Sequence, residues 1–213
     1  MHVGILGSGD VGKALARGFL SRGHTVTIGS REPSKLADFV REHPEKLTAK
    51  NFADTARESE IVVVATLFAG TQSALQLAGA ENFAGKIVID ATNPLKFEPG
   101  KPPSLSVSGA DSAGESVQRW LPGAMVVKAF NTVGNALFVD PHFAEGKPTM
   151  FVAGNDDAAK NRVAQIAESF GWDVLDAGPI SSARYLEAIA MVWIDYAIRT
   201  GTWQHAFKLL RKA

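Results

Sequence analysis

The stretch Gly7-Ser8-Gly9-Asp10-Val11-Gly12 has the G-x-G-x-x-G spacing of a tight connection between a strand and a helix. The apolar run 3–6 precedes it, and apolar residues then recur at helical spacing until Gly23, a residue typical of helix ends. In such a unit the first glycine makes the turn, the second lets a pyrophosphate approach, and the third lets the helix pack on the strand. The stretch therefore predicts a dinucleotide-binding βαβ unit, with the phosphates at the helix N-terminus.

The residues after the second predicted strand, 25–28, indicate which dinucleotide binds. An NAD site usually carries an acidic residue about 20 positions after the glycines, whereas a 2′-phosphate needs donors and positive charge. Ser30, Arg31 and Lys35 supply a hydroxyl, a guanidinium fork and an ammonium in this place. The pattern favours NADP(H), provided that the Glu32 carboxylate points elsewhere. The alternative is that Arg31 and Lys35 are solvated residues that open the next helix.

The composition excludes several functional classes. The chain has 213 residues, 22 basic and 22 acidic side chains and no cysteine, so disulfides, thiolate metal sites and a field that attracts nucleic acid are all excluded. The five histidines show no spacing typical of metal ligands, and we expect no metal site. A first strand that starts near Met1 and the absence of an apolar run of about 20 residues predict a cytoplasmic protein without a membrane partner.

Alternating apolar runs and amphipathic stretches predict the fold class. Further strands are expected at 61–66, 86–90, 124–130, 149–153 and 172–175, with a helix at about 158–170. The expected fold is α/β, a Rossmann-type doubly wound and mainly parallel sheet of about eight strands. Residues 1–180 would form the NADP(H)-binding domain, and residues 181–213 a short C-terminal helical segment that packs on this domain or on a dimer partner. Residues 93–109 form one long irregular insertion, and such loops are often functional.

Side chains that directly follow strands are candidates for the reacting end, because ligands of open α/β sheets bind at the carboxyl ends of the strands. These candidates are Thr66, Leu67, Phe68, Asn93, Pro94 and Asn131. The two asparagine amides suit the nicotinamide carboxamide or an acceptor carbonyl, and Leu67 and Phe68 suit a ring. Taken singly, however, each asparagine is better explained by turn formation or helix capping.

Three features of the second half of the chain leave alternatives open. Lys128 interrupts an apolar strand and needs either a buried partner or the cofactor cleft. Arg184 and Glu187 either contact an anionic acceptor or, as the residue spacing favours, form an ion pair on a solvated helix face. Residues 182–210 contain many aromatics in two predicted helical stretches, which cover the sheet or a second subunit in preference to stacking on an acceptor ring.

Several of these motifs together resemble a known family. Gly7–Gly12, Gly29-Ser30-Arg31 with Lys35, and the runs 90–95, 127–132 and 176–179 are similar to those of NADPH-dependent reductases of the deazaflavin coenzyme F-420, and to the cytosolic domain of six-transmembrane metalloreductases. The resemblance implies that Ser8, Gly9, Asp10 and Val11 line the pyrophosphate. It also implies that Ser30, Arg31 and Lys35 hold the 2′-phosphate and that the loops at 66, 93 and 131 hold the nicotinamide.

The function expected from this resemblance is hydride transfer between NADPH and a small-molecule redox acceptor of the deazaflavin type. Such a transfer needs two rings held face to face more than it needs an acid or a base, so no catalytic acid or base is assigned. The alternatives are an NADPH-dependent flavin or ferric reductase and a non-catalytic NADP(H)-binding redox sensor. A homodimer is the expected assembly.

Overall fold

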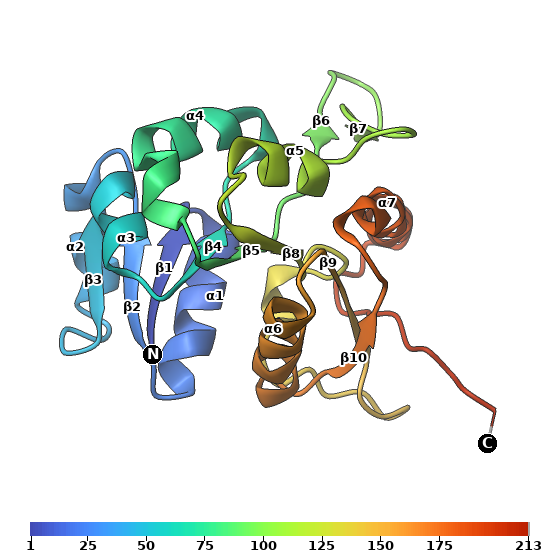
Figure 1. Cartoon of the computed structure of the whole chain (residues 1–213). Coiled ribbons are helices and arrows are strands. Elements are labelled where there is room, and N and C mark those ends of the chain that lie inside the picture. The colour runs from blue at the N-terminus through green and yellow to red at the C-terminus, as the bar shows by residue number, and fades with distance from the viewer. Residues whose placement is uncertain (213) are drawn as a thin grey trace.

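The computed structural model describes residues 1–212 and contains one mixed eight-stranded sheet (Figure 1). Its strands are β1 (His2–Leu6), β2 (Thr25–Gly29), β3 (Leu47–Lys50), β4 (Ile61–Val64), β5 (Ile87–Asp90), β8 (Met125–Lys128), β9 (Thr149–Gly154) and β10 (Asp173–Asp176). The strand order is β10-β9-β8-β5-β4-β1-β2-β3. Pairing is parallel from β3 to β8, β9 runs antiparallel to β8, and β10 is parallel to β9. The predicted mainly parallel, doubly wound sheet is thereby confirmed.

Helices cover both faces of this sheet. They are α1 (Asp10–Ser21), α2 (Ala37–Val40), α3 (Phe52–Glu58), α4 (Phe68–Ala78), α5 (Ala113–Trp120), α6 (Asp157–Ser169) and α7 (Ala183–Thr200). Short 3-10 turns are η1 (Pro33–Leu36), η2 (Ala80–Phe83), η3 (Asn135–Leu137) and η4 (Ile180–Ser182). In Figure 1, α1 and α6 lie below the sheet, and α4 and α5 lie above it. This arrangement explains why the central strands are apolar on both faces.

Two hydrophobic cores result, one on each face. Along β4, Val63 packs into the core between the sheet and helices α1 and α6. Val62 and Val64 pack into the core on the other face, between the sheet and helices α3, α4 and α5. All three side chains are completely buried. A continuous apolar run is therefore what a strand between two helical layers requires.

The strand register aligns the carboxyl ends of the parallel strands. Leu6 pairs with both Gly29 and Val64, Val64 pairs with Asp90, and Asp90 pairs with Lys128. The residue that follows each strand consequently lies on one edge of the sheet. The chain adds β2 and β3 on one side of β1 and then crosses over, so that β4 pairs with β1 on its other side. Ligands of such folds bind at this switch point.

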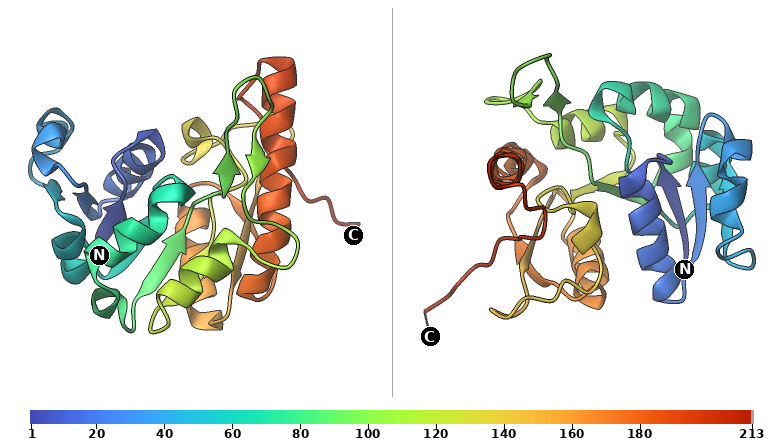
Figure 2. Two further views of the ribbon diagram at one scale, coloured as in Figure 1. Left: turned by 90° about the horizontal axis from the view of Figure 1, so that it is seen from above. Right: turned by 180° about the vertical axis from the view of Figure 1, so that it is seen from behind.

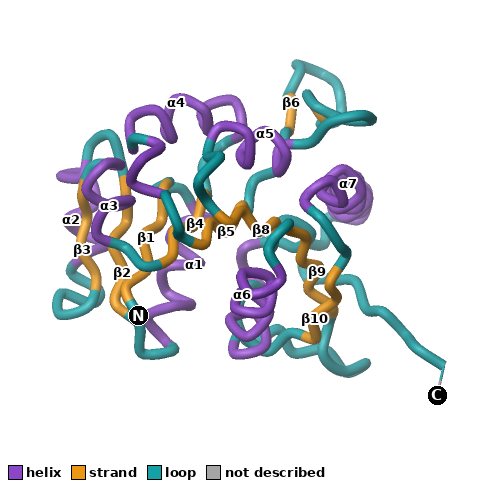
Figure 3. Tube along the Cα trace, viewed as in Figure 1, coloured by secondary structure: helices purple, strands orange, loops and turns teal. Residues whose placement is uncertain are grey.

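Two elements differ from the sequence-based expectations. The edge strand β3 was not predicted, because Leu47-Thr48-Ala49-Lys50 alternates apolar and polar residues over only four positions, which is a weak signal; the strand pairs only with β2. The second predicted helical stretch after residue 200 is wrong: residues 201–212 have no regular secondary structure and appear as loop in Figure 3. Gly201, in the left-handed conformation at φ 72°, ends α7 and turns the chain away from the helix axis.

The predicted insertion 93–109 contains a short antiparallel hairpin, β6 (Leu95–Lys96) with β7 (Ser104–Leu105). The hairpin projects from the end of β5 and lies beside α7 (Figure 2). Among residues 1–212, no helix combines the length and the apolar character that a bilayer crossing demands.

Candidate functional site

The turn between β1 and α1 has the geometry that the glycine pattern predicts. Gly7 has φ 123°, and a Cβ there would lie 2.4 Å from the Ala65 carbonyl oxygen. A Cβ on Gly12 would lie 2.0 Å from the carbonyl oxygen of Gly7, so only glycine lets α1 approach the turn. A Cβ on Gly9 would meet nothing within 4 Å. The first and third glycines are therefore required by the fold, whereas the second leaves open space at the surface.

The N-terminus of α1 faces this open space. Lys13 N–H donates the first intrahelical hydrogen bond to the Gly9 carbonyl at 3.0 Å, so the preceding N–H groups have no acceptor inside the helix. Gly9 is the N-cap residue and offers no capping side chain. Asp10 is exposed in the first turn, where a carboxylate is favoured by the helix dipole, and Ser8 and Val11 are half-buried beside it. These free N–H groups can hold a pyrophosphate.

The two cations after β2 have different environments. Lys35 Nζ pairs with Glu32 Oε2 at 2.8 Å, which directs that carboxylate to the ammonium. Arg31 is exposed, and within residues 1–212 its guanidinium forms no ion pair and no side-chain hydrogen bond. Ser30 Oγ accepts a hydrogen bond from Glu32 N–H at 3.2 Å and stabilises the turn. Of the three predicted 2′-phosphate residues, Arg31 alone thus presents an unpaired charge.

The loop after β4 places its three candidates differently. Leu67 is 78% exposed, and Thr66 Oγ1 shares a 2.8 Å hydrogen bond with Thr71 Oγ1. The Phe68 ring stacks on Trp120, with ring centroids 5.8 Å apart. Leu67 is accordingly the apolar side chain that is free to contact a ligand, whereas Phe68 already has an aromatic partner in α5.

Asn93 and Asn131 lie together at the ends of β5 and β8. Asn131 Nδ2 donates to Asn93 Oδ1 at 3.0 Å, and Asn93 Nδ2 donates to the Asn131 carbonyl at 2.7 Å. Neither residue caps a helix, so the pairing of these amides replaces the capping alternative. Pro94 is buried, and its carbonyl accepts hydrogen bonds from Ser106 N–H and Oγ at 2.7 and 3.0 Å. The predicted loops after β5 and β8 are therefore in direct contact.

Lys128 has a buried partner, which decides between the two alternatives. Its ammonium lies 2.9 Å from Asp90 Oδ2, 2.9 Å from Glu187 Oε1 and 2.5 Å from the Thr92 carbonyl. Burial alone would lower the pKa of Lys128, but the carboxylates of Asp90 and Glu187 reverse this effect and raise it above the ordinary value. The ammonium is therefore charged, and it binds buried groups and not the cofactor cleft.

The expected ion pair between Arg184 and Glu187 is wrong. Arg184 instead binds Glu115 of α5 through both carboxylate oxygens, at 2.8 and 2.6 Å. Glu187 is 1% exposed and accepts hydrogen bonds from Ala113 and Gly114 N–H at the start of α5. The apolar neighbours Ala183, Leu186 and Ala190 on the same helix face are the signal that could have placed Glu187 inside.

Phe130 was also missed by sequence reasoning. It precedes Asn131 with φ 63°, a left-handed conformation that a phenylalanine rarely adopts, and its side chain is buried. Its N–H donates to Met150 Sδ at 3.2 Å. Backbone strain of this kind is concentrated at functional sites, and it adds this loop to the candidate site.

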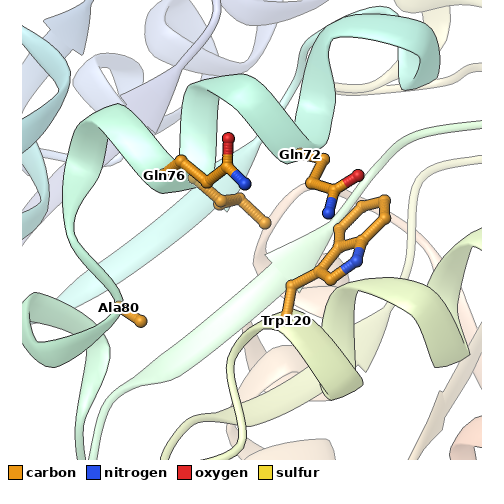
Figure 4. A pocket seen from close by; sticks show the side chains of 5 residues that line it. Gln72, Gln76, Ala80 and Trp120 are labelled. Atoms are coloured by element: carbon orange, nitrogen blue, oxygen red, sulfur yellow. The ribbon is translucent and has the colours of Figure 1, made fainter.

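A small hollow between α4, η2 and α5 lies away from the glycine turn. Gln72, Leu75, Gln76, Ala80 and Trp120 line it, and the Gln72 amide points toward the Trp120 indole (Figure 4). None of these side chains is titratable or nucleophilic. The candidate functional site therefore remains the edge formed by the ends of β2, β1, β4, β5 and β8.

Comparison with known proteins identifies the family. The family model described as "NADP oxidoreductase coenzyme F420-dependent" matches residues 2–94. A crystal structure from Arthrobacter sp. FB24, provisionally described as an F420-dependent NADP reductase, is similar with a TM-score of 0.93 and 44% identity. The match covers 98% of this chain and 99% of that chain. This chain belongs to that family.

Members of the family and their relatives differ in the acceptor that their names give. The F420-dependent NADP reductase of Methanothermobacter marburgensis is 28% identical over 211 residues, which cover 93% of each protein. Metalloreductase STEAP3 of Rattus norvegicus is 33% identical over 190 residues, which are 89% of this chain but 36% of that protein. This chain thus spans about a third of the length of the metalloreductases it matches. The family model is that of an NADP oxidoreductase, and these relatives are named reductases, in line with the expectation from the sequence.

Proposed function

We propose that this chain binds NADP(H) across the carboxyl edge of its sheet and transfers a hydride between NADPH and a deazaflavin-type acceptor. The observation that carries the NADP(H) assignment is the combination of an open Gly9 at the N-terminus of α1 with an unpaired Arg31 at the end of β2. The first suits a pyrophosphate and the second suits a 2′-phosphate. The pairing of Glu32 with Lys35 removes the one carboxylate that would oppose this assignment.

When bound, NADPH would supply a hydride, which carries both electrons of its C–H bond, and the acceptor would gain that hydride together with one proton from water, leaving NADP+. The chain's own contribution is positional. Gly9 and the α1 N–H groups hold the phosphates, Arg31 with Ser30 and Lys35 holds the 2′-phosphate, and the loops at Thr66, Asn93 and Asn131 hold the nicotinamide.

Two observations support a positional mechanism over acid or base catalysis. Asp90, the acidic residue at the ends of these strands, is completely buried and bound to Lys128. The candidate side chains at the ends of β4, β5 and β8 are otherwise hydroxyl, amide and apolar groups, including the exposed Leu67. An apolar surface beside paired amides suits a planar acceptor ring. The deazaflavin class is preferred among such rings because of the family to which the chain belongs.

The test is NADPH oxidation by the purified protein, measured in parallel with the deazaflavin coenzyme, free flavin and a ferric chelate, and with NADH as the control cofactor. Turnover with the deazaflavin and NADPH supports the proposal. Turnover with flavin or iron but not with the deazaflavin contradicts the proposed acceptor. Tight NADPH binding without turnover would instead favour a redox sensor.

A flavin or ferric reductase is the second candidate, favoured by the 33% identity to a named metalloreductase. The match covers 36% of that protein, so its metal-reducing activity is the weaker proposal for this chain. The parallel assay above separates the two candidates.

A cytoplasmic homodimer also stays a prediction. One face of α7 exposes Tyr185, Val192 and Tyr196, with exposed fractions between 43% and 71%. Such an apolar face suits a subunit contact. Sedimentation at micromolar concentration should give the mass of two chains, and Tyr196→Glu should shift it toward one.

A further inference from the structure

Three buried charged residues, which we call the Lys128 cluster, join β5, β8 and α7. They are Asp90, Lys128 and Glu187, and their side chains are 0%, 0% and 1% exposed. The cluster is fully bonded: Asp90 Oδ1 also accepts from Thr92 N–H at 2.9 Å, and Glu187 also binds two N–H groups of α5. Replacing buried ion pairs by well-packed apolar residues is often neutral or stabilising, so a net gain in stability does not by itself account for such a cluster.

The cluster is connected to the amide pair by three links. Lys128 Nζ binds the carbonyl of Thr92, which directly precedes Asn93. Asn131 lies three residues after Lys128, and its Nδ2 donates to the Leu186 carbonyl of α7 at 3.1 Å. Leu186 in turn precedes Glu187. One ammonium thus ties together the two loops that carry the amides and the helix that contacts one of them.

The two loops contain unpaired buried polar atoms and a strained residue, which are stable only if neighbouring elements hold the loops in place. Thr92 Oγ1 and Asn131 Oδ1 are buried and, among residues 1–212, have no hydrogen-bond partner. Phe130 is strained at φ 63°. Unpaired polar atoms and strained backbone persist only where the surrounding structure determines them. The Lys128 cluster and α7 supply that structure: a Cβ on Gly134 would lie 2.7 Å from the Trp193 ring of α7, so the loop and helix are in close contact.

We propose that Lys128 is a positioning residue for the nicotinamide end of the NADP(H) site. By binding Asp90, Glu187 and the Thr92 carbonyl together, it sets the relative position of Asn93, Asn131 and α7 without itself reaching the edge. This inference rests on the proposed function.

Because of the strand order, an effect of Lys128 on the nicotinamide end can be distinguished from a general loss of cofactor binding. β8 and β2 are four strand spacings apart in the sheet, roughly 19 Å. The 2′-phosphate end, at Arg31, is therefore distant from the cluster. A change at Lys128 should disturb the nicotinamide end and leave the adenosine end intact.

The experiment compares three variants with the unaltered protein. Lys128→Met removes the ammonium, and the triple variant Asp90→Asn, Lys128→Met, Glu187→Gln removes all three charges so that none is left unpaired. Arg184→Met is the matched control, because it breaks another ion pair between α5 and α7, at 34% exposure, that has no link to the amide loops. If Lys128→Met does not fold, the triple variant and Glu187→Gln carry the test.

Four measurements are made on each folded variant. The affinity for adenosine 2′,5′-bisphosphate, which lacks the nicotinamide, reports the adenosine end. The emission spectrum of bound NADPH reports the surroundings of the nicotinamide, and hydrogen exchange over residues 129–134 and 183–190 reports the loop and helix. Turnover with the deazaflavin gives kcat separately from KM.

Loss of Lys128 should leave the affinity for adenosine 2′,5′-bisphosphate within about 2-fold, as for distant sites. It should shift NADPH emission toward that of free NADPH, speed hydrogen exchange at both segments, and lower kcat by at least about 10-fold. Arg184→Met should leave the affinity, the NADPH emission, kcat and the exchange of residues 129–134 unchanged. Unchanged emission and kcat in a folded Lys128 variant overturns the inference and leaves the proposed function standing. Absence of NADPH binding by the unaltered protein overturns both.

Discussion

At the scale of single residues, Arg31 and Lys35 carry the same charge but have different partners. Lys35 is paired with Glu32 and its side chain is 72% exposed, whereas the Arg31 guanidinium is available to a ligand. An exposed ion pair contributes little, but a charged hydrogen bond to a bound phosphate contributes about 1.5–3 kcal/mol. The two cations should therefore differ in their contribution to cofactor choice.

Arg31→Ala should weaken NADPH binding by roughly 10- to 100-fold, the equivalent of that free energy. NADH affinity should change by no more than about 2-fold, because NADH has no 2′-phosphate for the guanidinium to bind. Lys35→Ala should weaken NADPH binding less than Arg31→Ala. The measurement is calorimetric titration with each cofactor, and equal losses for NADPH and NADH would refute the assignment of Arg31.

The glycine turn predicts a second contrast between residues. Gly9→Val should abolish NADPH binding while leaving the thermal midpoint nearly unchanged, since a Cβ there meets only open space and the backbone, at φ −77° and ψ −175°, suits a β-branched residue. Gly12→Ala should instead lower the thermal midpoint, because its Cβ would collide with the backbone of Gly7. Tight NADPH binding by a folded Gly9→Val variant would show that the phosphates bind elsewhere.

At the scale of secondary-structure elements, the pair Arg184–Glu115 joins α7 to α5. The bidentate bond from the Arg184 guanidinium holds the pKa of the Glu115 carboxyl below its ordinary value, against the opposing effect of burial. A carboxyl whose pKa is depressed on folding stabilises the folded state fully above the pKa it has when unfolded, about 4.3 for glutamate. That contribution is lost as the pH falls through the depressed value.

Arg184→Met should therefore reduce the free energy of unfolding by a constant amount between pH 7 and about pH 5, well above the unfolded glutamate pKa. The difference from the unaltered protein should shrink below about pH 4, where Glu115 takes up a proton in both proteins. Urea unfolding across this range measures it. A difference that is flat or grows on acidification would show that the pair does not stabilise the contact between α5 and α7.

At the scale of the whole molecule, residues 201–212 connect α7 to β9 although they form no helix. Trp193 Nε1 donates to the His205 carbonyl at 2.8 Å, and the two rings stack with centroids 4.6 Å apart. Thr149 N–H, at the start of β9, donates to the Phe207 carbonyl at 2.8 Å. The tail thus joins α7 to β9 through hydrogen bonds of the backbone and of a buried indole.

Deletion of residues 201–213 should lower the free energy of unfolding by about 2–5 kcal/mol, because Trp193 Nε1 and Thr149 N–H would each lose a partner at about 1–3 kcal/mol. Deletion of 211–213 alone is the control and should have little effect, since Arg211 and Lys212 are exposed. Chemical denaturation with tryptophan fluorescence provides the measurement. Equal stability of the two truncated proteins would mean that the tail does not stabilise the fold.

The sequence by itself determined the parts of this protein that depend on local spacing. The glycine turn, the buried parallel strands and the basic residues after β2 all follow from patterns within about 20 residues, where the chain's own geometry limits the outcome. The residues that follow the strands lie on one edge because the register of the parallel sheet aligns the strand ends.

Only the tertiary structure decided which of those residues meet. Lys128 and Asp90 are 38 residues apart, and Glu187 joins them from a helix face that sequence reasoning assigned to solvent. The asparagine pair, the paired state of Lys35 and the course of residues 201–212 were likewise undetermined by local pattern. The physical reason is that buried polar groups take whichever partner the packed chain brings within bonding distance, and that distance depends on the whole fold.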